Sequence, residues 1–111
     1  MNKYYNRKTE VDGITFDSKA ESTRYSELKL MNKAGYITDL VLQPKFILQE
    51  GFKKNGLTYR PIYYRADFQY FDKSLKQIII EDVKGQETKE FLIKKKLFEK
   101  RYADLSLSLV R

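Results

Sequence analysis

Two aspartates and a lysine interrupt otherwise apolar stretches in the second half of the chain. Asp67 lies within residues 63–71, and Asp82 and Lys84 end the run of residues 77–84. Both stretches are rich in β-branched and aromatic residues, which predicts two strands. Because side chains alternate along a strand, Asp82 and Lys84 point to the same face. Charges inside a small sheet are expensive to desolvate, so we expect them to serve chemistry.

The chemistry open to these residues is narrow, because the chain has no cysteine and no histidine. This excludes disulfides, zinc sites built from thiolate or imidazole, and mechanisms that use those side chains. Carboxylates, lysine, hydroxyls and a metal held by oxygen remain. Carboxylates that hold Mg²⁺ or Mn²⁺ suit phosphodiester cleavage, since the metal polarises the phosphate and a lysine orients the attacking water.

Composition indicates one domain with an anionic partner. The chain has 111 residues, with 22 Lys and Arg against 15 Asp and Glu, for a net charge of +7. This excess favours nucleic acid or an anionic membrane surface. No apolar run approaches the roughly 20 residues of a membrane span, and the N-terminus lacks a signal-peptide core. We therefore expect a cytoplasmic protein without a membrane partner.

The first half predicts a hairpin and a helix that carries an acid. Asp12-Gly13 is a strong hairpin signal, preceded by a basic arm over residues 1–9. Ser18 and Glu21 form a capping box, and Gly35 supplies the stop of a helix over residues 18–34. Glu21 shares the face of the apolar stripe, so we expect it to point toward the sheet.

The rest of the chain predicts a mixed sheet flanked by two helices, an α/β fold. A bend at Gln43-Pro44 divides two strands, and residues 50–58 fit an exposed hairpin loop. Residues 78–80, all isoleucine, indicate a strand buried on both faces. The expected elements are strands over 36–42, 45–49, 59–71, 76–84 and 105–109, and a lysine-rich helix over 88–103, with an apolar side of Phe91, Leu92, Leu97, Phe98 and Tyr102.

These residues together resemble the PD-(D/E)XK nuclease superfamily. Its signature is an Asp on one strand, then an acid, any residue and Lys on the next, as in Asp67 and Asp82-Val83-Lys84. Residues 13–21, 43–46, 64–68 and 81–85 look like a phage-borne branch that is similar to Holliday junction resolvases. The resemblance covers nearly the whole chain after residue 10. It implies a single nuclease-like domain over residues 1–111 with a restriction-endonuclease-like core.

The resemblance also implies roles for individual residues. Glu21, Asp67 and Asp82 would bind Mg²⁺ or Mn²⁺, and Lys84 would position or activate the water. The chain departs from the signature in two ways: Ala66 replaces the proline before the Asp, and the second acid is Asp. Neither change removes a required functional group, although the shorter Asp82 side chain alters the spacing of the ligands.

Each site residue also has a purely structural interpretation. Capping of the helix could be the sole role of Glu21. Asp82 and Lys84 could be a salt pair on an edge strand, and Asp67 could be solvated on an open face. Glu81 points opposite to Asp82, which indicates a structural or solvent-facing role.

The candidate DNA contacts are less specific than the carboxylates. Lys94, Lys95 and Lys96 could contact phosphates, although a lysine-rich helix is more often a solvated face. Gln43 could touch the backbone of the substrate or simply fill a turn.

We therefore expect a metal-dependent endonuclease of phage origin that acts on branched DNA in the cytoplasm of a bacterial host. Junctions with two-fold symmetry suit two active sites, which predicts a homodimer. The alternatives are a nuclease fold that retains DNA or protein binding without turnover, and a structural phage protein.

Overall fold

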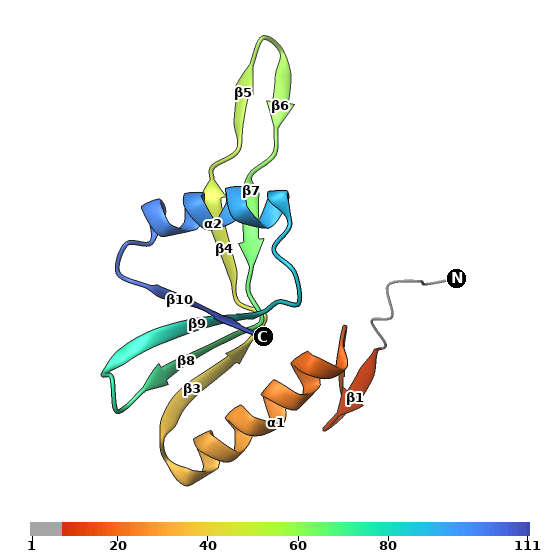
Figure 1. The fold of residues 1–111 in the computed structure, drawn as a ribbon. Coiled ribbons are helices and arrows are strands. Elements are labelled where there is room, and N and C mark those ends of the chain that lie inside the picture. The colour runs from red at the N-terminus through yellow and green to blue at the C-terminus, as the bar shows by residue number, and fades with distance from the viewer. Residues whose placement is uncertain (1–7) are drawn as a thin grey trace.

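The protein has a mixed α/β fold, seen in a computed structural model that describes residues 8–111 (Figure 1). The basic arm predicted for residues 1–9 lies outside these residues except at its end, where Thr9 begins the first strand. The elements in chain order are β1 (Thr9–Val11), β2 (Ile14–Phe16), α1 (Lys19–Ala34), β3 (Ile37–Leu42), β4 (Lys45–Gln49), β5 (Phe52–Lys54), β6 (Leu57–Tyr59), β7 (Ile62–Arg65), β8 (Phe68–Asp72), β9 (Gln77–Val83), α2 (Lys89–Arg101) and β10 (Ser106–Val110).

The first hairpin and α1 form as the sequence predicts. Asp12 and Gly13 both have positive φ, 54° and 76°, which is the backbone of the two-residue turn that this pair favours. The Ser18 hydroxyl caps α1 by accepting a hydrogen bond from the Glu21 N–H. Gly35 ends the helix in the left-handed region at φ 88°.

The central sheet has four strands in the order β10-β9-β8-β3. The β8 strand pairs antiparallel with both β3 and β9, whereas β10 pairs parallel with β9. A parallel neighbour requires a crossover connection, and α2 supplies it between β9 and β10. The predicted mixed sheet with two helices is therefore confirmed.

Each helix packs on its own side of this sheet, and β9 contributes to both sides (Figure 1). Ile79 belongs to the core that contains Leu28 of α1, and Ile80 belongs to the core that contains Phe98 of α2. This alternation confirms that the centre of β9 is buried on both faces. Ile78 departs from the prediction, since 40% of it is exposed near the β8–β9 turn.

The stretch predicted as one strand over residues 59–71 is divided, which corrects the expectation. β8 pairs within the central sheet, but β7 pairs with β4 in a separate two-stranded sheet. The Ala66 N–H donates to the Pro44 carbonyl at 3.0 Å, and the Gln43 N–H donates to the Asp67 carbonyl at 2.8 Å. Because the two bends are hydrogen-bonded, β4 and β7 leave the sheet together.

Residues 50–58, predicted as an exposed hairpin loop, contain strands β5 and most of β6, which pair as a hairpin that projects beyond the body and confirm the prediction (Figure 1). The predicted apolar side of α2 needs a correction. Phe91 and Phe98 are buried, but Leu92 is 43% exposed and Leu97 is 38% exposed. The helix packs through a narrow stripe, which leaves these two leucines outside the core.

Neither helix in the described part of the chain is long and apolar enough to cross a membrane.

Candidate active site

Asp67 lies at the crossing between β7 and β8, directly beside the end of β9. Its backbone N–H donates to the Glu81 carbonyl at 3.0 Å, and its carboxylate accepts a hydrogen bond from the Val83 N–H at 2.7 Å. Phe68 is opposite Glu81 in the strand register, so Asp67 falls opposite Asp82 one step further along. The tertiary fold thus brings together the two aspartates that the sequence separates by 15 positions.

Asp82 is buried, with 4% of its side chain exposed, and it contacts Tyr64 and Lys84. The Tyr64 hydroxyl donates to its Oδ2 atom, and the Lys84 Nζ lies 3.7 Å from the same oxygen. Lys84 is also held by Phe91, whose ring centroid lies 4.7 Å from Nζ. The Lys84 side chain remains 29% exposed. It is therefore oriented by neighbours yet open to solvent.

Glu21 reaches this region from the first turn of α1. Its helix-capping contact uses the backbone N–H, which donates to Ser18 Oγ at 3.1 Å. Its side chain lines two adjacent hollows, one of about 200 Å³ with Asp67 and Gln43, and one of about 680 Å³ with Lys84. The capping role and a role for the carboxylate are therefore compatible.

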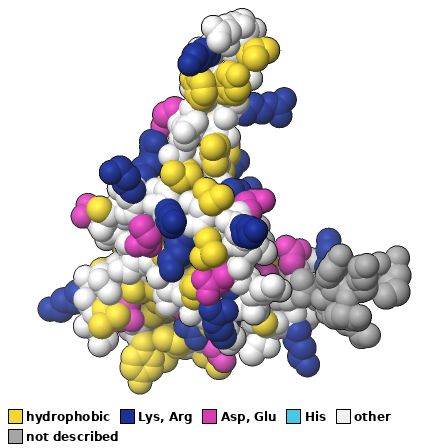
Figure 2. Space-filling model, turned by 45° about the horizontal axis from the view of Figure 1, so that its top comes forward, with side chains coloured by type: hydrophobic (Ala, Val, Ile, Leu, Met, Phe, Trp, Pro, Cys, Tyr) yellow, Lys and Arg dark blue, Asp and Glu magenta, His cyan; other side chains and the backbone are white. Residues whose placement is uncertain are grey.

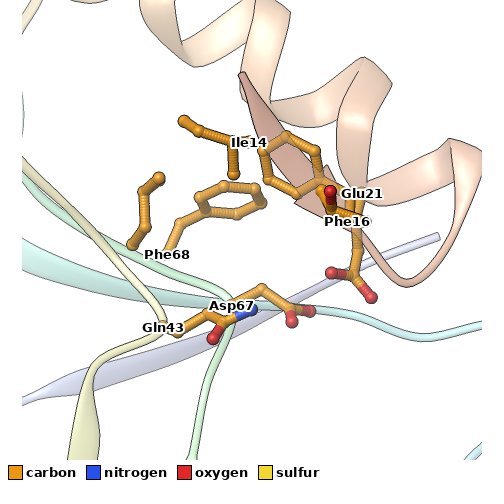
Figure 3. Close-up of a pocket in the computed structure, with 8 residues that line it drawn as sticks. Ile14, Phe16, Glu21, Gln43, Asp67 and Phe68 are labelled. Atoms are coloured by element: carbon orange, nitrogen blue, oxygen red, sulfur yellow. The ribbon is translucent and has the colours of Figure 1, made fainter. Parts of the chain in front are cut away.

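Figure 3 shows the smaller hollow, with Glu21 descending from α1 and Asp67 facing the same space. Gln43 lies beside them, held at the β3–β4 bend in the left-handed region at φ 52°. Ile14, Phe16 and Phe68 form the apolar wall of the hollow (Figure 3). An apolar wall next to carboxylates excludes water from one side and strengthens their interactions.

The surroundings raise the pKa of Asp67 and of Glu21. Burial, the neighbouring Asp82 and the charge of Glu21 raise the pKa of Asp67 to about 8, against the opposing hydrogen bond from Val83. Burial also raises the pKa of Glu21, as do the charges of Asp17 and Asp82, while Lys84 acts in the opposite direction. The three acids therefore share one electrostatic field, and a cation placed among them would be stabilised.

The acidic side chains in the described part of the chain do not by themselves form a complete set of metal ligands. Within residues 8–111, no three acidic side chains converge tightly enough to form a group that could hold a metal ion as they stand. The donor types fit a divalent cation, because all are carboxylate oxygens.

Tyr64, the hydroxyl partner of Asp82, is not among the site residues predicted from the sequence. Burial and Asp82 both raise the pKa of Tyr64, which keeps the phenol protonated and able to donate. The sequence contains only a weak signal that Tyr64 belongs to the site. Tyr64 shares the apolar run that contains Asp67, but only the division of that run into β7 and β8 directs its hydroxyl to β9.

Glu81 is structural, as one of its two predicted interpretations stated, and the solvent-facing interpretation is wrong. It is 2% exposed and receives two hydrogen bonds from Arg24 of α1, at 2.8 and 2.6 Å, and one from the Tyr70 hydroxyl. These contacts satisfy the carboxylate on the α1 side of the sheet. They also anchor α1, and therefore Glu21, against β9.

The candidate lysines of α2 lie apart from both hollows. Lys94 Nζ is 3.3 Å from Glu90 Oε2 one turn earlier. Lys95 and Lys96 line a separate hollow on the outer side of α2, next to the exposed Leu92. The structure therefore does not bring these three residues to the carboxylates, although all belong to the helix that follows Lys84 closely.

Comparison with known proteins returned one match. A family model described as "Protein of unknown function (DUF1064)" matches residues 1–111. No curated protein and no solved structure shows significant similarity to the chain. The geometry of the site is thus the basis for assigning a function.

Proposed function

The chain belongs to the DUF1064 family of unknown function, and we propose that it is a metal-dependent endonuclease acting on branched DNA. The observation that carries the proposal is the meeting of Asp67, Asp82 and Lys84 at one end of β9. Glu21 lies beside them on α1. The mixed sheet with a helix on each side is compatible with the restriction-endonuclease-like core that the sequence resemblance implies.

Asp67, Asp82 and Glu21 would hold the divalent ion. Burial and neighbouring carboxylates raise the pKa of Asp67 and of Glu21, so a positive charge placed between them would be stabilised, which supports this assignment. Bound Mg²⁺ or Mn²⁺ supplies Lewis-acid activation of a phosphodiester and of a water molecule. Tyr64 holds the Asp82 carboxylate in place by donating to it, so that less rearrangement is needed on binding.

Lys84 is the group that acts on the reacting atoms. Its ammonium is anchored between Asp82 and Phe91 and remains partly exposed beside the larger hollow. From this position it can orient a water for attack or neutralise the charge that develops on the phosphate. A lysine held by two neighbours spends little conformational entropy on reaching that position.

The charge of +7 supports a polyanionic substrate. Branched DNA is the proposed substrate, and we extend the proposal to a homodimer. A two-fold junction presents two equivalent strands, whereas one small domain carries one site. Lys94, Lys95 and Lys96 would then contact phosphates away from the cleaved bond, and Gln43, beside Asp67, would contact the DNA backbone near it.

A second candidate is a DNA-binding module that lacks turnover. This candidate is favoured because no three acidic side chains within residues 8–111 form a group that could hold a metal ion. The module would bind DNA in a salt-sensitive way and would not cut it when Mg²⁺ or Mn²⁺ is added.

The deciding experiment is a cleavage assay on labelled four-way junction, flap, fork and duplex DNA with Mg²⁺ or Mn²⁺. We expect the wild-type protein to nick at least one branched substrate, and Lys84→Ala to lower the rate by about 10²-fold or more. Lys73→Ala is the matched control, because Lys73 is an exposed lysine in the β8–β9 turn. If the wild type and Lys84→Ala behave alike on every substrate, the proposal fails.

A further inference from the structure

The hairpin of β5 and β6, with the residues that lead into it (residues 51–60, hereafter the arm), exposes large apolar side chains. Phe52 is 44% exposed, Leu57 is 57% exposed and Tyr59 is 43% exposed. The arm extends away from both helices in Figure 1. A two-stranded hairpin is marginally stable in water, and clustered apolar groups on a surface mark a contact site. These two features indicate that the arm is a contact surface.

Two aromatic rings form a flat surface on the arm. Phe52 pairs with Tyr59 across the strands, and the two rings lie 4.7 Å apart at an interplanar angle of 14°. Each ring covers one face of the other and leaves much of its own surface open. Because side chains alternate, the next pair on the same face is Lys54 and Leu57, close to the tip. The face combines stacked aromatics with an apolar and cationic end.

The charge on the arm is entirely positive. Residues 51–60 contain Lys53, Lys54 and Arg60 and no Asp or Glu. Glu50, just before the arm, is paired with Arg101 of α2 at 2.7 Å, so its charge is compensated. Figure 2 shows hydrophobic and basic side chains side by side on the projecting part. Stacked aromatic rings with a lysine, Lys54, on the same face suit a strand of nucleic acid, because the rings match its bases and the lysine matches its phosphates.

The base of the arm is braced, which fixes the direction in which the rings project. A Cβ at Gly51 would meet the Tyr59 carbonyl oxygen at 3.0 Å and Pro61 Cδ at 3.1 Å. The two strands thus approach closely where the arm begins, and the Glu50–Arg101 pair ties this point to the end of α2. The tip turns at Asn55-Gly56, both with positive φ, in the turn that matches the twist of the strands.

We propose that the arm binds unpaired bases of the DNA substrate, which stack on Phe52 and Tyr59 while Lys54, on the same face, contacts the phosphates. This inference rests on the proposed nuclease function and deepens it, because unpaired bases occur where strands branch. A second copy of the chain is the competing occupant of the apolar face. Charge disfavours it, since the arm is positive throughout and the whole chain carries +7.

The test measures DNA binding without cleavage, in EDTA, by fluorescence anisotropy. The probes are a single strand of about 16 nucleotides, which covers one stacking site, a fork and a blunt duplex. We expect Phe52→Ala and Tyr59→Ala each to weaken binding of the single strand by about 5- to 100-fold. Phe52→Tyr and Tyr59→Phe keep the ring and should bind like the wild type. Leu30→Ala, at a residue 69% exposed on α1, is the control for loss of an exposed apolar group.

Two further readouts distinguish stacking from other contacts. A 2-aminopurine in the single strand should be quenched on binding to the wild type but not to Tyr59→Ala, because quenching reports stacking. Lys54→Gln should lower the slope of log K against log salt by about 0.7, the value for one phosphate on a single strand. Equal affinity of wild type and Phe52→Ala for the single strand and the fork would overturn the inference. Loss of a dimer in Phe52→Ala by light scattering, with DNA affinity unchanged, would assign the arm to a second copy instead.

Failure of the arm and failure of the nuclease proposal give different results. If cleavage depends on Lys84 but the arm variants bind DNA like the wild type, only the inference about the arm is overturned. Arm-dependent binding without cleavage under any metal overturns only the nuclease function. Absence of DNA binding by the wild type overturns both.

Discussion

Replacement of Asp67 by asparagine should remove a pH-dependent loss of stability. The pKa of this carboxyl group is raised from 3.8 to about 8 in the folded protein. Between these values the unfolded chain releases the proton while the folded chain retains it, so the free energy of unfolding falls as the pH rises. Asparagine keeps an oxygen that can accept from the Val83 N–H but does not titrate.

The magnitude follows from the pKa. One pH unit corresponds to about 1.4 kcal/mol, so a rise to about 8 sets a ceiling of about 5 to 6 kcal/mol. Asp67 lines an open hollow and shares its field with Asp82 and Glu21, so solvent screening lowers this value. We expect Asp67→Asn and the wild type to be equally stable near pH 4, and the variant to be more stable by about 1–3 kcal/mol at pH 8.

The assay is urea denaturation across this pH range in EDTA, with Asp104→Asn as a control at an exposed carboxylate in the turn before β10. Addition of Mn²⁺ should reverse the order at pH 8, because an ion bound to the folded state at 100 times its Kd stabilises by about 2.7 kcal/mol and the variant has lost a ligand. A stability difference between the two proteins that does not change from pH 4 to pH 8 would refute the reasoning.

Three other substitutions test the supports of the site. Arg24→Ala leaves Glu81 buried without its guanidinium partner and should lower the free energy of unfolding by about 3 kcal/mol in urea denaturation, whereas a loss below about 0.5 kcal/mol would contradict the anchoring role. Tyr64→Phe removes the donor to Asp82 and should cost about 1–3 kcal/mol, measured in the same way. Gly35→Ala places a Cβ at φ 88° and should destabilise by about 1–2 kcal/mol, and an unchanged melting temperature would contradict the left-handed cap.

Local patterns in the sequence were sufficient to predict most of the secondary structure. The turn at Asp12-Gly13 and the boundaries of α1 depend on residues within a few positions of one another. The break at Gln43-Pro44 was also visible, since proline cannot continue a strand there. The single strand expected over residues 59–71 was wrong because its division depends on the hydrogen bonds to the distant Gln43-Pro44 bend.

The sequence by itself determined which side chains are available for chemistry at this site: Asp67, Asp82, Lys84 and Glu21, in a chain with no histidine or cysteine. It also determined the shared face of Asp82 and Lys84, because the alternation of a strand is local. Only the tertiary structure decided the rest. The β8–β9 register put Asp67 beside Asp82, the Arg24–Glu81 contacts held α1 against β9, and Tyr64 came to Asp82 from another sheet. These contacts join residues far apart in the chain, so their geometry depends on packing that no local pattern encodes.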